Sequence, residues 1–208
     1  KGGYRRAMEG IQNLIDEDFF KAIQVTTVFN HESIKEIDAL YEIFMKMDID
    51  SWRVIGVEPI GRALEYPGLL LTPDDQRQLF SFIKSKREEG FPVCSGCSHF
   101  LGLEYERDVR GWYFLCIAGL NVASIDAAGD IRACLDIEKL PETVQGNILK
   151  ESVTQVWYNR FEMFRKKLSL RNKKCFECKY DSWCAGGAHH SWDYRKEEQM
   201  ICMKDILF

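Results

Sequence analysis

The stretch that decides the fold is Cys175-Phe-Glu-Cys178, followed by Cys184-Ala-Gly-Gly187 and closed by Cys202. Five residues separate Cys178 from Cys184, and seventeen separate Cys184 from Cys202. The two residues inside a Cys-x2-Cys pair turn the chain so that both sulfurs reach one metal centre. We therefore expect these four thiols to converge on one metal site.

A second group of cysteines lies upstream, so the eight cysteines of the chain divide into two sets of four. The upstream set is Cys94, Cys97, Cys116 and Cys134. From spacing alone, zinc and an iron–sulfur cluster are both open, because thiolates suit either metal. For zinc, His189 is an alternative to Cys202 as the fourth ligand. Disulfides are less expected, because the N-terminus carries no apolar core of a secretory signal.

Composition excludes several classes of protein. Among 208 residues, hydrophobic side chains make up 46%, enough for a packed core. The formal net charge is −4 with no long basic run, which argues against a nucleic-acid surface. No apolar run approaches the roughly 20 residues of a membrane span. We expect a cytoplasmic protein whose cysteines bind metal.

The first half of the chain alternates helical and strand patterns. Apolar spacing predicts a helix over Tyr4–Ile15, and β-branched residues predict strands over Ala22–Phe29 and Ser51–Val57. Asn30 or Ser33 can cap a helix between the strands, and Thr72-Pro73 begins another that reaches about Arg87. This alternation is typical of parallel strands joined by crossover helices. Two such strands leave exposed edges, so we expect further strands from a preceding part of a longer protein.

After about residue 90, which we take as a domain boundary, helical signals become few. Residues 121–125 and 130–135 flank Asp126-Ala-Ala-Gly129, a hairpin signature. An amphipathic helix is predicted within Asn147–Leu170, with Ser152 and Gln155 as a capping box.

The cysteine pattern resembles the SPASM extension of radical S-adenosylmethionine (SAM) enzymes. That pattern runs Cys, Gly-x4-Cys, Cys-x2-Cys-x5-Cys-x3-Cys and a last Cys. In this chain it is matched by Cys116, Gly129, Cys134, Cys175, Cys178, Cys184 and Cys202. Gly-Asp-Ile before Cys134 and Gly146-Asn-Ile before the Trp157 helix also fit the family.

The resemblance implies an α+β fold in two parts. Residues 1–90 would be the C-terminal portion of a partial (β/α) radical SAM barrel, and 91–208 a SPASM domain with a β-hairpin and a helix. The SPASM domain would carry two auxiliary 4Fe–4S clusters. Residues at two strand ends, namely Thr27, Asn30, Pro59, Gly61 and Arg62, would contact SAM. A surface ion pair between Arg62 and Glu65 is the alternative for that arginine.

Two departures from the family pattern bear on function. The family's Cys-x3-Cys partner after Cys184 is Ala188, so the first cluster has either the Cys94/Cys97 pair as added ligands or an open iron. His99, His189 and His190 are further candidates to replace a thiolate. The Cys-x3-Cys-x2-Cys motif that holds the SAM-cleaving cluster is absent, so this chain is not expected to cleave SAM by itself.

The function implied by the resemblance is radical modification of a peptide or protein. Its implied partners are that substrate, a preceding radical SAM portion, and a reductant such as a flavodoxin or ferredoxin. No catalytic residue is assigned. Two other functions stay open: a zinc- or cluster-stabilised module that binds a peptide or partner chain, and an electron-transfer protein.

Overall fold

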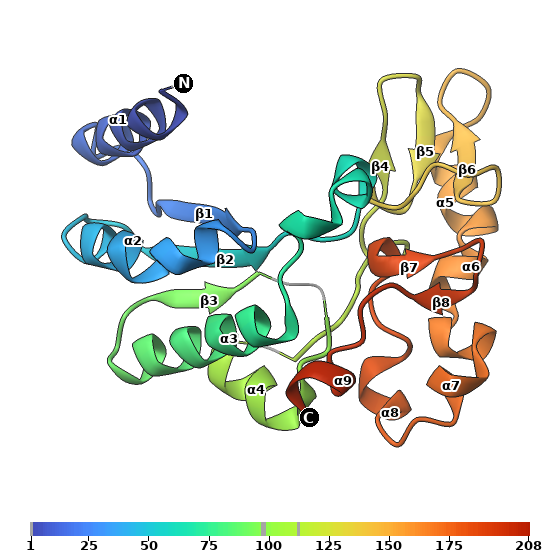
Figure 1. Ribbon diagram of the computed structural model, residues 1–208. Coiled ribbons are helices and arrows are strands. Elements are labelled where there is room, and N and C mark those ends of the chain that lie inside the picture. Colours follow the sequence, from blue (N-terminus) through green and yellow to red (C-terminus); the bar gives the residue numbers. More distant parts are fainter. Residues whose placement is uncertain (1, 97–98, 112) are drawn as a thin grey trace.

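The computed structural model describes residues 2–96, 99–111 and 113–208. The half on the left of Figure 1 alternates helices with strands, and the half on the right is built from short strands and short helices. With η for a 3-10 helix, the first half contains α1 (Gly3–Asp16), β1 (Gln24–Phe29), η1 (Ser33–Glu36), α2 (Ile37–Phe44), β2 (Ser51–Gly56), η2 (Gly61–Glu65), η3 (Pro67–Leu69), α3 (Pro73–Glu88), β3 (Val93–Ser95) and α4 (Gly102–Val109).

Strands β1, β2 and β3 form one parallel sheet in that order, which confirms the predicted strands and crossover helices. The register sets Thr26 beside Arg53 and Arg53 beside Cys94, so these three residues form one row across the sheet. The third strand was not predicted. It extends the sheet past residue 90, and the division of the chain at that residue stays a prediction.

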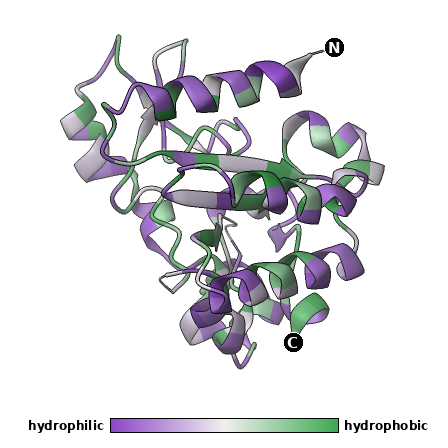
Figure 2. Cartoon of the chain, turned by 90° about the vertical axis from the view of Figure 1, so that its left-hand side faces the viewer, coloured by the Kyte–Doolittle hydropathy of each residue, from purple (hydrophilic) through white to green (hydrophobic). Residues whose placement is uncertain are grey.

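The two faces of this sheet have different environments because successive strand residues point to opposite sides. One face packs against α2 and α3, and its Trp52 and Val54 are fully buried. The other face carries the exposed side chains of Thr26, Val28 and Arg53. Helix α1 is largely hydrophilic (Figure 2), and no residue in it is buried. The helices therefore cover one side of the sheet, as in a segment of a (β/α) barrel.

Helix α3 begins as the sequence predicts, with Pro73 in its first turn and Thr72 as its N-cap. The Asp75 carboxylate accepts hydrogen bonds from the backbone N–H and hydroxyl of Thr72, at 2.8 and 2.7 Å. His31 Nδ1 lies 2.6 Å from the same carboxylate and ties the end of β1 to this helix. Burial raises the pKa of Asp75, but hydrogen bonds from His31 and Thr72 outweigh burial and hold the pKa below its usual value.

We expect Asp75→Ala to lower the free energy of unfolding by about 1–2 kcal/mol at pH 7, because it removes a capping group. Its stabilisation is complete above the ordinary aspartate pKa of about 3.9 and is lost as the pH falls through the lower folded pKa. Urea unfolding at pH 7 and at pH 3 measures both effects. The control is Asp74→Ala, whose carboxylate is 94% exposed. Equal losses for the two variants at pH 7 would contradict this role of Asp75.

The hairpin predicted around Asp126–Gly129 is confirmed, with β4 (Ser124–Ile125) antiparallel to β5 (Asp130–Arg132). Gly129 has a φ of +83°, and the Asp126 carboxylate accepts from the backbone N–H of Ala128 at 2.9 Å. A third strand, β6 (Val144–Asn147), pairs with β5 and was not predicted.

The helix predicted within Asn147–Leu170 is three shorter pieces: α5 (Val153–Arg160), α6 (Glu162–Arg165) and η4 (Leu168–Arg171). The chain leaves helical geometry at Phe161, where φ is −81° and ψ is 14°. The predicted capping box is wrong, because the Ser152 side chain makes no capping hydrogen bond although Ser152 is the N-cap. Val156, Phe161 and Phe164 from the predicted apolar stripe are buried in the core of this half.

Short elements complete the chain: α7 (Lys173–Phe176), α8 (Asp181–Cys184), η5 (His189–Ser191), β7 (Trp192–Asp193), β8 (Glu198–Gln199) and α9 (Lys204–Leu207). Helix α9 returns to the first half and lies beside α3 (Figure 1). Met203, just before α9, is buried in the core of that first half. Throughout the described ranges, every helix is too short or too polar to cross a lipid bilayer.

Candidate metal centres

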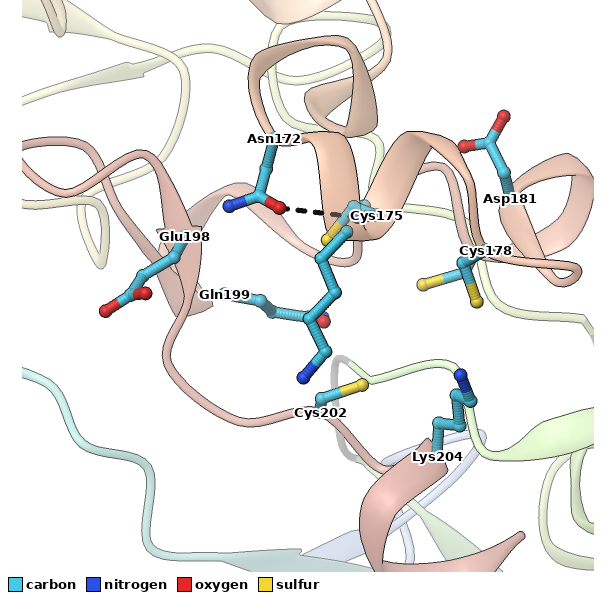
Figure 3. Close-up of a pocket in the computed structure, with 11 residues that line it drawn as sticks. Asn172, Cys175, Cys178, Asp181, Glu198, Gln199, Cys202 and Lys204 are labelled. Atoms are coloured by element: carbon cyan, nitrogen blue, oxygen red, sulfur yellow. Dashed lines mark hydrogen bonds between the residues drawn. The ribbon is translucent and has the colours of Figure 1, made fainter.

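Four cysteines from the C-terminal stretch line one cavity of about 160 Å³, which we call the C-terminal cavity. They are Cys175, Cys178, Cys184 and Cys202. Figure 3 shows the sulfur atoms of Cys175, Cys178 and Cys202 turned toward the same space, from α7, the turn after it, and the segment before α9. The structure thus brings together the set that the spacing predicts.

Local hydrogen bonds fix the chain around this cavity. The Asn172 side chain caps α7 by accepting from the Cys175 backbone N–H at 3.3 Å (Figure 3). The Cys178 N–H donates to the Cys175 carbonyl at 3.1 Å, which closes the Cys-x2-Cys turn. Cys184 ends α8, and its N–H donates to the Tyr180 carbonyl at 2.9 Å. Hydrogen bonds of the backbone N–H groups therefore hold Cys175, Cys178 and Cys184 in place.

The glycines after Cys184 allow a close approach of two chain segments. Gly186 has a φ of +92°, and a Cβ at this position would lie 2.4 Å from the backbone nitrogen of Ser169. The Gly186 N–H hydrogen-bonds the Cys184 thiol. The Gly187 N–H instead donates to the Cys184 carbonyl at 2.8 Å. A residue with a side chain at position 186 would push the Cys184 turn away from η4.

Two thiols of this cavity, those of Cys184 and Cys175, have raised pKa values. Burial, with the nearby thiols of Cys202, Cys175 and Cys178, raises the pKa of Cys184 to about 12. Burial and the neighbouring cysteines also raise the pKa of Cys175. A metal that binds here must displace protons, which thiophilic cations such as iron and zinc do. Lys174 and Lys204 also line the cavity and would offset part of the negative charge of the thiolates.

Three cysteines of the upstream set line a second cavity of about 560 Å³, which we call the central cavity. Cys94 comes from β3, Cys116 from the segment before the hairpin, and Cys134 from the residues after β5. Ala188 and His190 line the same cavity. Cys97, the fourth predicted member of this set, lies outside the described residues.

The donor sets fit a group larger than one ion. Within the described ranges, no three His, Cys, Asp or Glu side chains are close enough together to hold a single metal ion. A tetrahedral zinc site needs four donors about 2.0–2.3 Å from one point. Here the thiols surround cavities, as suits a cluster in which each thiolate binds a different iron.

The residues predicted to contact SAM follow β1 and β2, whose C-terminal ends share one edge of the sheet. Thr27 accepts a 2.9 Å hydrogen bond from the buried Trp52 Nε1, and Asn30 caps its own turn by accepting from Ser33 N–H at 2.8 Å. Pro59 is buried, whereas Gly61 and Arg62 are exposed. In the described part of the chain, Arg62 makes no ion pair with Glu65. The contacts of these residues with SAM stay a prediction.

Of the three histidines considered as ligands, two are engaged within the protein. His189 Nδ1 bonds the Tyr194 hydroxyl at 2.6 Å and its Nε2 bonds the Phe164 carbonyl at 3.3 Å, while burial lowers its pKa to about 4. His99 Nε2 lies 2.9 Å from both carboxylate oxygens of Glu58. Sequence reasoning missed the Glu58–His99 pair, because no spacing links residues 41 positions apart.

Comparison with known proteins agrees with this geometry. Residues 116–179 match the model of the SPASM family, described as an iron–sulfur cluster-binding domain. This match is the one that the cysteine pattern predicts. Among curated proteins it is 27% identical over 191 residues to the mycofactocin maturase MftC of Mycolicibacterium smegmatis. It is 26% identical over 190 residues to MftC of Mycobacterium tuberculosis. These alignments cover 90% and 89% of this chain, which spans about half (47%) of either relative.

Solved structures confirm the fold class. Streptococcus suis SuiB bound to S-adenosylmethionine superposes with a TM-score of 0.56 at 18% identity, covering 80% of this chain and 40% of SuiB. Native anSMEcpe with bound AdoMet superposes with a TM-score of 0.55 at 19% identity, covering 82% of this chain and 48% of that protein. The fold is therefore that of part of these proteins.

Proposed function

We propose that this chain supplies the auxiliary-cluster part of a radical SAM maturase that modifies a peptide or protein. The observation that carries the proposal is the C-terminal cavity, where four cysteines from three segments of the chain surround one space. Two of them, Cys175 and Cys178, lie within the residues that match the cluster-binding family, and Cys184 and Cys202 follow it. Both curated relatives reported above are named as maturases of mycofactocin.

In this proposal, Cys175, Cys178, Cys184 and Cys202 hold one 4Fe–4S cluster. Cys94, Cys116 and Cys134 bind the other in the central cavity, and the sequence predicts Cys97 beside them. When bound, such clusters supply one-electron transfer. The protein residues would hold the thiolates in position, whereas Trp183 and Phe176, the sequence neighbours of Cys184 and Cys175, are more than half exposed and do not line the cavity. Exposed Lys173, Lys174 and Lys179 around that set would suit an acidic reductant of the flavodoxin or ferredoxin type.

The remaining partners follow from the same proposal. SAM and the cluster that cleaves it would be bound with a preceding radical SAM portion, and Asn30, Pro59, Gly61 and Arg62 would contribute from one sheet edge, with Thr27 nearby. Peptide substrates are supported by the solved complexes of anSMEcpe with bound AdoMet and Cys peptides. The cytoplasmic location rests on cysteine usage and stays a prediction. A zinc-stabilised binding module is the weaker alternative, because its donors would have to meet at one ion.

Anaerobic reconstitution with ferrous iron and sulfide tests the proposal. We expect a brown protein with about eight iron and eight sulfide per chain, for two 4Fe–4S clusters, and a broad absorbance near about 400 nm. With SAM and dithionite, this chain alone should release 5′-deoxyadenosine at the background rate. A colourless protein that binds zinc stoichiometrically and no sulfide would overturn the cluster assignment. Rapid SAM cleavage would contradict the need for a preceding portion.

A further inference from the structure

The central cavity has a histidine where the cysteine pattern leaves a gap. The residue at the family's next thiolate position is Ala188, which lines the cavity and has no ligating atom. Two residues further on, His190 lines the same cavity. The intervening His189 is turned to the other side, where it bonds Tyr194 and Phe164 within the core. This alternation places Ala188 and His190 on one side of the chain.

The imidazole of His190 is not committed to another group. It is partly buried and makes no hydrogen bond within the described residues. His189 and His99, by contrast, bond Tyr194 and Glu58. The His190 ring therefore lines the cavity beside Cys94, Cys116 and Cys134 with no hydrogen bond to other described residues, so it is available to bind a group held there.

We infer that His190 is the fourth ligand of the cluster in the central cavity, beside the thiolates of Cys94, Cys116 and Cys134. This assignment rests on the proposed function. Imidazole is an established iron ligand, and replacing a thiolate with it removes one negative charge from the cluster. Histidine ligation is known to raise the potential of iron–sulfur centres. The cluster in the central cavity should therefore accept an electron more readily than the cluster in the C-terminal cavity, which has four thiolates.

Nitrogen spectroscopy on the reconstituted, reduced chain tests the assignment. With ¹⁵N-labelled histidine, pulsed EPR should detect a nitrogen coupled to one cluster. His190→Ala should abolish that coupling, and His31→Ala, which changes a histidine bonded to Asp75 and absent from the cavity lining, should retain it. His190→Cys should keep the iron content, lose the coupling and shift the midpoint potential of that cluster downward. Cys97→Ser should leave the coupling and the iron content unchanged.

Cys134→Ser separates this inference from the proposed function. If Cys134→Ser removes about half of the iron but the labelled chain shows no histidine coupling, the central cavity holds a cluster and His190 is not its ligand. If Cys97→Ser, rather than His190→Ala, changes the spectrum, the fourth ligand is that thiolate and the inference is overturned. If Cys134→Ser leaves the iron unchanged, the central cavity holds no cluster, and both the inference and that part of the proposed function fail.

Discussion

Cys178→Ala is expected to lose the cluster of the C-terminal cavity and to leave the other cluster in place. The iron content should fall by about half, because one of two 4Fe–4S clusters is removed. Because metal ligation contributes directly to folding, we expect the free energy of unfolding to fall by about 4 kcal/mol or more. The Tm should fall by roughly 8–16 °C. Iron and sulfide analysis with anaerobic calorimetry measures both effects.

The matched control is Glu177→Ala, the neighbouring residue, whose exposed carboxylate pairs with Lys173 across one helical turn. An exposed pair of this kind contributes about 0–1 kcal/mol, so iron content and Tm should hardly change. If Cys178→Ala behaves like this control, the four cysteines of the C-terminal cavity do not hold a cluster.

Trp52→Ala should destabilise the chain by about 3–5 kcal/mol, because truncating a buried tryptophan leaves a large cavity. Trp52 is fully buried, and its ring lies 5.2 Å from Phe44 and 5.9 Å from Phe82, measured between centroids. The substitution also leaves Thr27 without its hydrogen-bond donor. A fall in Tm of roughly 6–20 °C follows.

Tyr158→Ala serves as the comparison for Trp52→Ala, because this aromatic ring is 71% exposed. Exposed substitutions usually change stability by less than about 0.5 kcal/mol. Both variants should bind the same amount of iron when folded, since neither residue lines a cysteine cavity. A Trp52 variant as stable as the Tyr158 variant would mean that the sheet is not stabilised by this core.

The sequence predicted those features whose causes are local. Thr72, Pro73 and Asp75 carry all the signals of a helix start, and α3 begins there. Asp126 and Gly129 contain the turn chemistry of a hairpin, and the strands pair around them. The spacing of Cys175, Cys178, Cys184 and Cys202 was likewise sufficient to predict that they line one cavity, because cysteines that share a metal site must lie close together.

Features decided by distant contacts were missed. The helical pattern of residues 147–170 is continuous, yet the chain bends at Phe161 so that Phe161 and Phe164 both pack against Gly119. Helix α4 begins at Gly102 with a φ of +81°, a residue that ordinarily disfavours helix. Its start is held by the Glu106 carboxylate, which accepts from the N–H groups of Leu101 and Phe114.

The candidate sites also divide into features with local causes, which were predicted, and features set by distant contacts, which were not. The sequence treated His99, His189 and His190 alike, because a linear pattern does not tell which way each ring turns. In the fold, His99 meets Glu58 and His189 meets Tyr194, while His190 lines the central cavity. Cys94 lies in a segment for which the sequence predicted no strand, but its strand β3 places it next to Arg53.

The return of the last residues to the first half has a practical consequence for handling the protein. Cys202 lines the C-terminal cavity, and the adjacent Met203 is anchored among the side chains beneath the parallel sheet. If the proposed cluster is bound through Cys202, its loss in air would release one link between the two halves, and removal of the last residues by a carboxypeptidase would release the other. Affinity tags are best fused ahead of α1, where no side chain is buried, rather than after Phe208, whose ring packs on Phe100 and Tyr180.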